Sequence, residues 1–157
     1  YIAKETRALK SENVRVRFIG DRIRLDHKLV ALMDELEQFT STCTGVNLTI
    51  AINYGSRDEV ARAVKRLAQD AAAGRLDPDT VNEETLTRYL DTHVLPDPDL
   101  VIRTSGEARI SNFLLWQSAY AEYEFVDTLW PDFSAEEFTR LVEGYRARDR
   151  RFGAVKA

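Results

Sequence analysis

The spacing of apolar positions divides the first half of the chain into alternating strands and helices. Where apolar and basic side chains alternate, as in Val14 to Ile19, the two-residue period predicts a strand with one polar face. Where apolar side chains recur every three to four residues, the period predicts an amphipathic helix, and Gly74 ends one of these. The elements predicted here are a helix end at 1–12, strands at 14–19 and 46–55, and helices at 26–42 and 60–74.

The second half continues this alternation. Ser134 followed by Glu137 is the signature of a helix start, in which the serine caps the first turn. Ser111 and Asn112 could cap another helix in the same way, because an apolar run follows them. The elements predicted here are helices at 82–91, 113–120 and 134–148, and a strand at 99–104. Strands that alternate with helices indicate one α/β domain over 1–157, with a mainly parallel central sheet flanked by helices.

Composition and charge then restrict the class of protein. The chain has 157 residues, of which 44% are hydrophobic, so it is long enough and apolar enough to bury a core. Its net charge of -4 gives no basic field for nucleic acid, so any anion must be bound locally. No apolar run approaches the roughly 18 residues of a membrane span. We therefore expect a cytoplasmic protein without a transmembrane segment or a nucleic-acid partner.

Three smaller features of the sequence carry less weight. The single cysteine, Cys43, cannot form an internal disulfide, and it has no evident partner for nucleophilic chemistry. His27 and His93 have no second ligand at metal spacing. The chain begins at Tyr1, inside what looks like a helix and without a start methionine or targeting signal, so we expect that an N-terminal part of the protein precedes it.

The stretch with the clearest chemistry is DLVIRTSGEARIS, residues 99–111. Arg103 ends a predicted strand and Arg109 follows a polar turn, and two neighbouring guanidinium groups repel each other unless a negative group lies between them. Ligands of open α/β sheets bind beyond the carboxyl ends of the strands, where we expect Arg103 and the end of strand 46–55 to lie. With the Ser111 hydroxyl and exposed amides, the two arginines would form a site for phosphate or diphosphate.

The alternative for the two arginines is structural. Arg103 and Arg109 could instead form ion pairs with Glu107 and Asp99 in a surface loop. For two arbitrary loop arginines this would be the better interpretation. The apolar runs on both sides of the turn favour the anion site here.

Glu122 lies in the aromatic segment AYAEYEFVDTLW. It shares strand parity with Glu124, so the simplest interpretation is a solvated strand face. The functional interpretation is that one carboxylate binds a divalent cation. Mg²⁺ suits a neighbouring diphosphate, because it takes one or two carboxylates together with phosphate oxygens.

These residues resemble a known family. DLVIRTSGEARISNFLLWQSAYAEYEFVDTLWPDF is similar to the C-terminal signature of the cis-prenyltransferases, the isoprenyl transferases that include undecaprenyl diphosphate synthase. NLTIAINYGSRDEV resembles the family's Asn-Tyr-Gly-Gly-Arg segment, and VRVRFIGDR resembles the strand and turn before it, so the resemblance covers nearly the whole chain.

The resemblance implies a reaction and its site. Isopentenyl diphosphate would condense repeatedly onto an allylic diphosphate, usually farnesyl diphosphate, with each new double bond in cis and with Mg²⁺ required. The expected product is undecaprenyl diphosphate, the lipid carrier of cell-wall synthesis, which would be handed to the membrane. On the matching positions, Arg103, Arg109, Ile110 through its backbone, and Ser111 would hold isopentenyl diphosphate, and Glu122 would be a Mg²⁺ ligand. No residue of this chain is assigned a direct catalytic role.

The resemblance also implies a homodimer, and the segment YAEYEFVDTLWPDF is aromatic enough to contribute to its interface. In some relatives a terminal Arg-x-Gly reaches the partner's site, which Arg151-Phe152-Gly153 could copy. Asn53, Arg57 and Glu59 could support the site, although Arg57 could equally form an ion pair at a helix start.

Departures from the family pattern leave two alternatives open. Ala108 stands where many bacterial members have His, and Ser56 replaces the second Gly of Asn-Tyr-Gly-Gly-Arg. The family's Met-Asp-Gly-Asn-Gly-Arg-Trp and Phe-Ser-x-Glu-Asn-Trp segments, which hold the allylic diphosphate, are not in these 157 residues. We therefore expect these 157 residues to bind one substrate and to complete the active site only together with the N-terminal part. A non-catalytic subunit of a cis-prenyltransferase is the first alternative, against which the intact Arg103, Arg109, Ser111 and Glu122 speak. The second, an unrelated phosphate-binding enzyme, lacks a glycine-rich phosphate loop.

Overall fold

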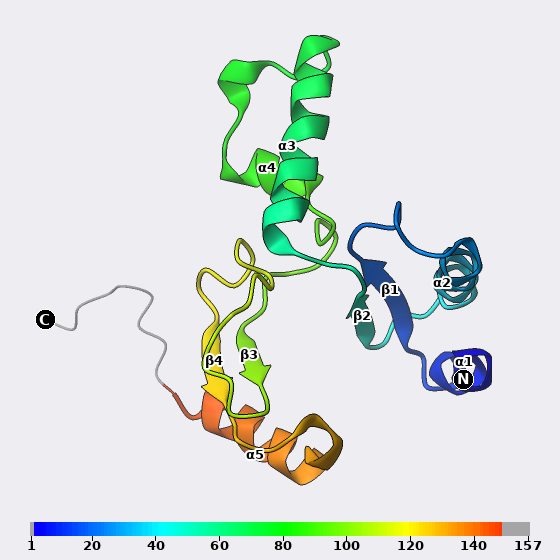
Figure 1. The fold of residues 1–157 in the computed structure, drawn as a ribbon, viewed down its shortest axis with the longest axis vertical. Coiled ribbons are helices and arrows are strands. Elements are labelled where there is room, and N and C mark those ends of the chain that lie inside the picture. The colour runs from blue at the N-terminus through cyan, green and yellow to red at the C-terminus, as the bar shows by residue number, and fades with distance from the viewer. Residues whose placement is uncertain (1, 149–157) are drawn as a thin grey trace, which may run out of the picture. The chain divides into compact units, whose positions relative to one another are not determined.

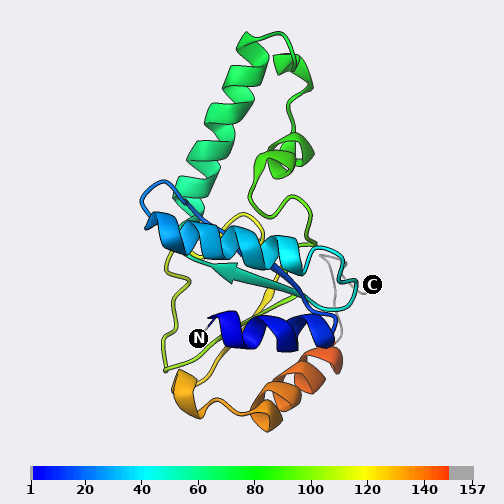
Figure 2. The same ribbon diagram turned by 90° about the vertical axis from the view of Figure 1, so that its right-hand side faces the viewer.

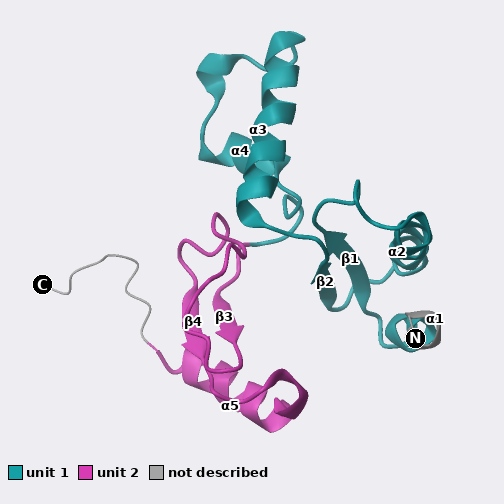
Figure 3. Ribbon diagram, viewed as in Figure 1, with its two compact units in different colours: residues 1–96 teal, residues 97–157 magenta. Residues whose placement is uncertain are grey.

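The computed structural model describes residues 2–148, with side chains from residue 6 onward, and forms two compact units (Figure 3). Unit 1 comprises residues 1–96 and unit 2 residues 97–157. The elements of unit 1 are α1 (Ile2–Ser11), β1 (Arg15–Ile19), α2 (His27–Phe39), β2 (Asn47–Ala51), α3 (Ser56–Ala72), the short helix η1 (Pro78–Thr80) and α4 (Glu83–Tyr89) (Figure 1). Those of unit 2 are β3 (Leu100–Arg103), β4 (Glu122–Phe125), η2 (Trp130–Asp132) and α5 (Ala135–Arg146).

Within residues 2–148, each unit contains one pair of parallel strands. β1 pairs with β2 in unit 1, and β3 pairs with β4 in unit 2. The α/β class and the parallel strand direction predicted from the sequence are therefore confirmed. The prediction that both pairs belong to one domain stays a prediction.

The core of unit 1 forms where α2 lies along the β1–β2 pair, as Figure 2 shows. Alternation along β1 turns Val16 and Phe18 toward α2, where they pack against Met33 and Leu36. All four side chains are buried because the two-residue period of the strand meets the three-to-four-residue period of the helix. Asp26 caps α2 by accepting a hydrogen bond from the Lys28 amide at 2.9 Å.

Side chains of unit 1 also cover the edge of β1 that faces away from β2. The Val16 amide donates to the Thr40 hydroxyl at 3.1 Å, and the Phe18 amide donates to the Glu37 carboxylate at 2.7 Å. At the end of the strand, the Gly20 amide donates to the Asp91 carboxylate at 3.2 Å. Three successive outward amides are thus bonded, so this edge offers no free donors to another strand.

Thr40 provides a test of this arrangement. Its side chain is fully buried, and its hydroxyl donates to the Leu36 carbonyl at 2.8 Å while accepting from Val16. We expect Thr40→Val to lower the free energy of unfolding by about 1–3 kcal/mol, because it leaves the Val16 amide buried without a partner. Urea denaturation measures the change. The exposed neighbour Ser41 is the control, and equal losses in Thr40→Val and Ser41→Ala would contradict the buried role.

One predicted helix is absent from unit 2. The segment 111–120, which the sequence suggested as a capped helix, forms consecutive turns. Ser111, Asn112 and Leu114 have φ values of 51°, 62° and 46°, and a right-handed helix cannot start through left-handed backbone. The prediction of a helix over 113–120, with Ser111 and Asn112 as its caps, was therefore wrong.

The other predicted elements form with small shifts of their ends. α5 begins as expected after Ser134, whose hydroxyl oxygen accepts from the Glu137 amide at 3.1 Å. α3 begins four residues before Val60, the first apolar position that predicted it, and its first turn buries the polar side chain of Glu59. α3 ends before Gly74, whose φ is 69°.

Candidate functional site

The pair β3–β4 positions the arginines of unit 2. The register aligns Leu100 with Glu122 and Arg103 with Phe125, so Arg103 lies at the carboxyl end of the pair. After Arg103 the chain turns through Ser105 and Gly106, whose φ values are 72° and 66°. The turn returns Arg109 toward the strand end, as the sequence predicted.

The two arginines contact each other through the backbone. The Arg103 guanidinium donates from Nη1 to the main-chain carbonyl of Arg109 at 2.6 Å. The Arg109 guanidinium forms an ion pair with Glu107 on the surface of the turn. The pairing of Arg109 with Glu107 that the sequence left open as an alternative is thus present. At 63% exposure the Arg109 side chain remains accessible to an anion, and an exposed ion pair of this kind is worth little.

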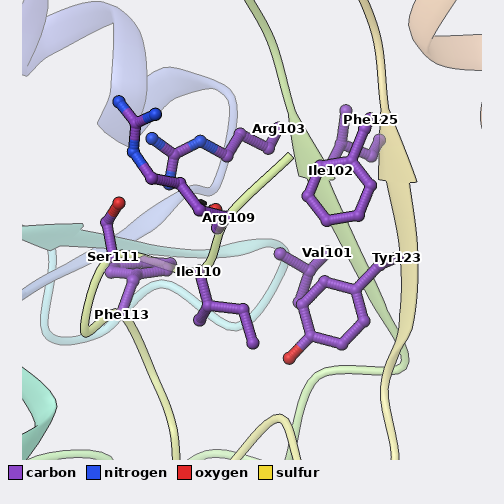
Figure 4. A pocket seen from close by; sticks show the side chains of 9 residues that line it. All are labelled: Val101, Ile102, Arg103, Arg109, Ile110, Ser111, Phe113, Tyr123 and Phe125. Atoms are coloured by element: carbon purple, nitrogen blue, oxygen red, sulfur yellow. Dashed lines mark hydrogen bonds between the residues drawn. The ribbon is translucent and has the colours of Figure 1, made fainter. Parts of the chain in front are cut away.

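A cavity of about 180 Å³ opens beside these groups (Figure 4). In Figure 4 the guanidinium groups of Arg103 and Arg109 and the hydroxyl of Ser111 point to one side of it. Apolar side chains form the remaining wall, and the rings of Tyr123 and Phe125 stack with their centroids 6.0 Å apart. The wall consists of Val101, Ile102, Ile110, Phe113, Tyr123 and Phe125. All four residues predicted to bind substrate, Arg103, Arg109, Ile110 and Ser111, line this one cavity.

This arrangement is suited to an amphipathic anion. Two guanidinium groups and a hydroxyl provide donors for phosphate oxygens, and charge-assisted bonds from Arg are among the stronger hydrogen bonds in proteins. The apolar wall offers burial to a hydrocarbon part of the same molecule. A plain phosphate would leave this wall unused, so the cavity favours a ligand with a short apolar chain on its phosphate group.

Glu122 lies elsewhere in unit 2. It begins β4, three ladder positions from Arg103, a distance of about 10 Å along the strand. Its strand parity also places it on the face opposite Tyr123 and Phe125, together with Glu124. The structure thus does not bring Glu122 to the cavity of the arginines, and its role as a metal ligand stays a prediction.

Glu122 and Glu124 share one cationic partner. The Arg148 guanidinium binds Glu122 at 2.9 Å and also contacts Glu124. The hydrogen bond to Glu122 is the main cause that raises the pKa of Arg148, followed by that to Glu124. The acidic face is therefore a half-buried carboxylate pair that holds a cation, rather than the freely solvated face that parity alone suggested.

The part of the chain that the structure describes contains neither a further metal site nor a membrane-spanning helix. No cluster of three or more His, Cys, Asp or Glu side chains within 2–148 could hold a metal ion. None of the helices in this part of the chain is long and apolar enough to span a membrane. Arg151, Phe152 and Gly153, named from the sequence, lie outside the described residues.

The strand ends of unit 1 form a polar cluster of their own. Glu59 is fully buried, and its carboxylate accepts from the Tyr54 hydroxyl at 2.6 Å and from the Asp91 amide at 2.8 Å. The Asp91 carboxylate in turn binds the Arg62 guanidinium through two hydrogen bonds of 3.1 and 2.8 Å. Hydrogen bonding to Asp91 is the main cause that raises the pKa of Arg62. This cluster fixes the ends of β1 and β2 and gives Glu59 a supporting role there.

Asn53 supports the same strand ends. Its φ of 50° places it in left-handed backbone, and its side-chain amide donates to the Asp21 carbonyl at 2.8 Å. A polar cavity of about 310 Å³ lies beside it, lined by Asp21, Arg24, Asn53, Tyr54, Gly55 and Asp58. Because each unit is described by itself, the expectation that these strand ends share an edge with Arg103 stays a prediction.

Two parts of unit 2 were not predicted from the sequence, namely the apolar wall of the cavity and the partner of the acidic pair. Tyr123 and Phe125 carried a usable signal, since they alternate with Glu122 and Glu124 and must face the other side of β4. Arg148 carried none, because it lies 26 residues from Glu122 in sequence.

Comparisons with known proteins agree with these observations. A family model described as putative undecaprenyl diphosphate synthase matches residues 1–153. An isoprenyl transferase of Agrobacterium fabrum is 52% identical over 155 residues, which are 99% of this chain and 63% of that protein. One from Aquifex aeolicus is 49% identical over 155 residues, covering 99% of this chain and 64% of that protein. The chain thus spans less than two thirds of the length of these curated relatives.

Solved structures give the same result. Lavandulyl diphosphate synthase from Lavandula x intermedia, in complex with dimethylallyl diphosphate, matches with a TM-score of 0.92 and 31% identity, over 97% of this chain and 66% of that one. A probable undecaprenyl diphosphate synthase from Campylobacter jejuni matches with a TM-score of 0.83 and 39% identity, over 97% of this chain and 69% of that one. The resemblance found in the sequence motifs is confirmed, and the chain belongs to the undecaprenyl diphosphate synthase family of isoprenyl transferases.

Proposed function

We propose that this chain carries the isopentenyl diphosphate site of a cis-prenyltransferase, which condenses isopentenyl diphosphate onto an allylic diphosphate. One observation carries the proposal: Arg103, Arg109 and Ser111 point to one side of a cavity whose other wall is apolar. The diphosphate would bind the guanidinium groups and the hydroxyl, and the five-carbon chain would lie against Tyr123 and Phe125. Anchoring the diphosphate in this way would present the double bond to the allylic carbon in a fixed orientation.

The proposed site also binds Mg²⁺, with Glu122 as a ligand of the ion. The carboxylates of Glu122 and Glu124 both bind a cation already, the Arg148 guanidinium. Carboxylate oxygens are also the ligands that a hard divalent ion prefers, so this pair fits Mg²⁺. Two carboxylates do not complete a magnesium shell, and phosphate oxygens and water would supply the rest. Bound there, the ion would offset negative charge on a leaving diphosphate.

Arg148 should then compete with the metal. We expect Arg148→Ala to raise the affinity for Mg²⁺ by about twofold to fivefold, because an exposed arginine no longer occupies the two carboxylates. Titration with Mn²⁺ as a paramagnetic probe, followed by displacement with Mg²⁺, measures this without an activity assay. Arg146→Ala is the matched control, since it removes a positive charge from the end of α5 and keeps Arg148. Equal affinities in the two variants would speak against a shared site.

The finer parts of the proposal follow the relatives. Farnesyl diphosphate is the proposed allylic substrate and undecaprenyl diphosphate, a cell-wall lipid carrier, the proposed product, in a cytoplasmic enzyme that hands this lipid to the membrane. The complex of the lavender enzyme with dimethylallyl diphosphate supports an allylic diphosphate as co-substrate. A homodimer is supported by exposed aromatic side chains around β4 and α5, namely Tyr120, Trp130 and Phe138.

A non-catalytic subunit is the second candidate. It would keep the fold and lose phosphate ligands, and the presence of Arg103, Arg109 and Ser111 in one cavity argues against it. The test is incorporation of labelled isopentenyl diphosphate onto farnesyl diphosphate, with Mg²⁺, by the protein encoded by the full open reading frame. Chain extension would support the enzyme, and product length would identify the polyprenyl diphosphate. No extension would favour the non-catalytic subunit.

A further inference from the structure

The turn between the two arginines needs support from outside itself. Ser105 and Gly106 are consecutive residues with positive φ, 72° and 66°. Left-handed backbone is unfavourable for a residue with a side chain, so the Ser105 conformation persists only if its surroundings hold it. Both residues are exposed, so side-chain burial does not hold the turn.

The segment after β4 provides the first support. The Ser105 amide donates to the Thr128 carbonyl at 2.9 Å, and the Gly106 amide donates to the Val126 carbonyl at 2.9 Å. Val126 itself donates its amide to the Arg103 carbonyl at 2.9 Å, which continues the β3–β4 pairing by one residue. The segment 126–128 therefore holds the turn in its conformation through main-chain hydrogen bonds.

Glu137 in turn holds the segment 126–128 in place. Its carboxylate oxygen Oε1 accepts from the Thr128 hydroxyl at 3.0 Å, and its side chain is only 20% exposed. At the third position of α5, a glutamate of a capping box is expected to turn back to the amide of the capping residue, here Ser134. Instead, the carboxylate reaches across to Thr128, while the serine half of the motif forms normally. Arg140 lies 3.6 Å from the same oxygen on the solvent side.

We propose that Glu137 and Thr128 are positioning residues for the diphosphate site. Glu137 fixes Thr128, the segment 126–128 fixes Ser105 and Gly106, and the turn sets the spacing of Arg103 and Arg109. Neither residue touches the ligand, and the assignment of diphosphate to this site rests on the proposed function. The supporting contacts are all within unit 2.

The support of the turn is tested first, by amide hydrogen exchange of the unliganded protein. We expect the Ser105 and Gly106 amides to exchange at least about tenfold faster in Glu137→Ala and in Thr128→Val, because their acceptors are no longer held. Glu137→Gln keeps an oxygen acceptor for Thr128 and should restore the slow rates. Thr139→Val removes another hydroxyl of α5, bonded to the Ala135 carbonyl at 2.8 Å, and should leave the turn unchanged. Unchanged exchange of Ser105 and Gly106 in Glu137→Ala would overturn the proposal.

The consequence for the ligand is tested second, with the protein encoded by the full open reading frame. We expect the KM for isopentenyl diphosphate to rise about fivefold to tenfold in Glu137→Ala and Thr128→Val, the effect of losing one hydrogen bond of positioning, while kcat falls less than twofold. Glu137→Gln and Thr139→Val should retain the original KM. Faster exchange with an unchanged KM would overturn the positioning role. If the unmodified enzyme incorporates no isopentenyl diphosphate, the proposed function fails, and with it the assignment of the ligand, whereas hydrogen exchange still decides whether Glu137 supports the turn.

Discussion

Replacing Arg103 with alanine is expected to lower kcat/KM for isopentenyl diphosphate by about two to four orders of magnitude. The reason is that a guanidinium can give two charge-assisted hydrogen bonds to a diphosphate, each worth about 1.5–3 kcal/mol. The substitution also removes the bond from Arg103 to the Arg109 carbonyl, so the second arginine loses a restraint. Steady-state incorporation of labelled isopentenyl diphosphate by the full open reading frame product measures the effect.

Two further variants make this prediction specific to the site. Arg103→Lys keeps the positive charge and loses the planar fork, and it should fall between the original protein and the alanine variant. Arg88→Ala removes an exposed arginine, whose contact to Glu84 is 3.9 Å long, and should leave kcat/KM within about twofold. A loss in Arg103→Ala no larger than that in Arg88→Ala would place the diphosphate elsewhere.

The largest effect on stability is expected at Gly20, which directly follows β1. Its φ is 116°, a conformation that alanine rarely adopts, and an added Cβ would lie 2.1 Å from the Ile52 carbonyl oxygen. Backbone strain of about 1–3 kcal/mol and a collision with main chain of similar cost should together lower the free energy of unfolding of Gly20→Ala by about 3–5 kcal/mol. Urea denaturation should show a lower midpoint with an unchanged slope.

A substitution at Gly74 distinguishes the cost of backbone strain from the cost of the collision with main chain. Gly74 also has positive φ, 69°, but an added Cβ would meet no atom within 4 Å. Gly74→Ala should therefore cost only the backbone strain, about 1–2 kcal/mol. Similar losses in Gly20→Ala and Gly74→Ala would mean that the chain relaxes around the Ile52 carbonyl, and that the close approach of the two strand ends is not fixed.

Periodic elements could be predicted because their signal is local. The alternation in β1 and the three-to-four-residue period in α2 follow from which face of each element is buried, and both elements form within a few residues of the predicted ends. The apolar period does not reach the start of α3, which lies four residues before Val60. Glu59 occupies a buried position but is polar, and only its bonds from Tyr54 and Asp91 make that burial possible.

The helix expected over 113–120 shows where a local signal fails. An apolar run of this length fits a helix, and the Ser118 amide does bond the Leu114 carbonyl at 2.8 Å, as in a helical turn. Left-handed backbone at Ser111, Asn112 and Leu114 nevertheless prevents a regular helix from forming. The Ser118 hydroxyl donates to the Leu114 carbonyl at 2.6 Å, and the Tyr123 hydroxyl donates to Ser118 Oγ at 2.7 Å. Tyr123 belongs to the following strand, so its contribution could not be read from the run itself.

Most strands and helices of this protein, although not the expected helix over 113–120, could be predicted from the sequence alone, and so could the grouping of Arg103, Arg109, Ile110 and Ser111, which line one cavity. These residues lie within nine positions of each other around a single turn, so short-range geometry was sufficient to bring them together. The ion pairs of Arg148 with Glu122 and Glu124, and the hydrogen bond of Glu137 to Thr128 instead of to its own helix end, became visible only in the folded structure. A charged side chain binds whichever group the fold brings within reach, and that choice depends on how segments distant in sequence pack together.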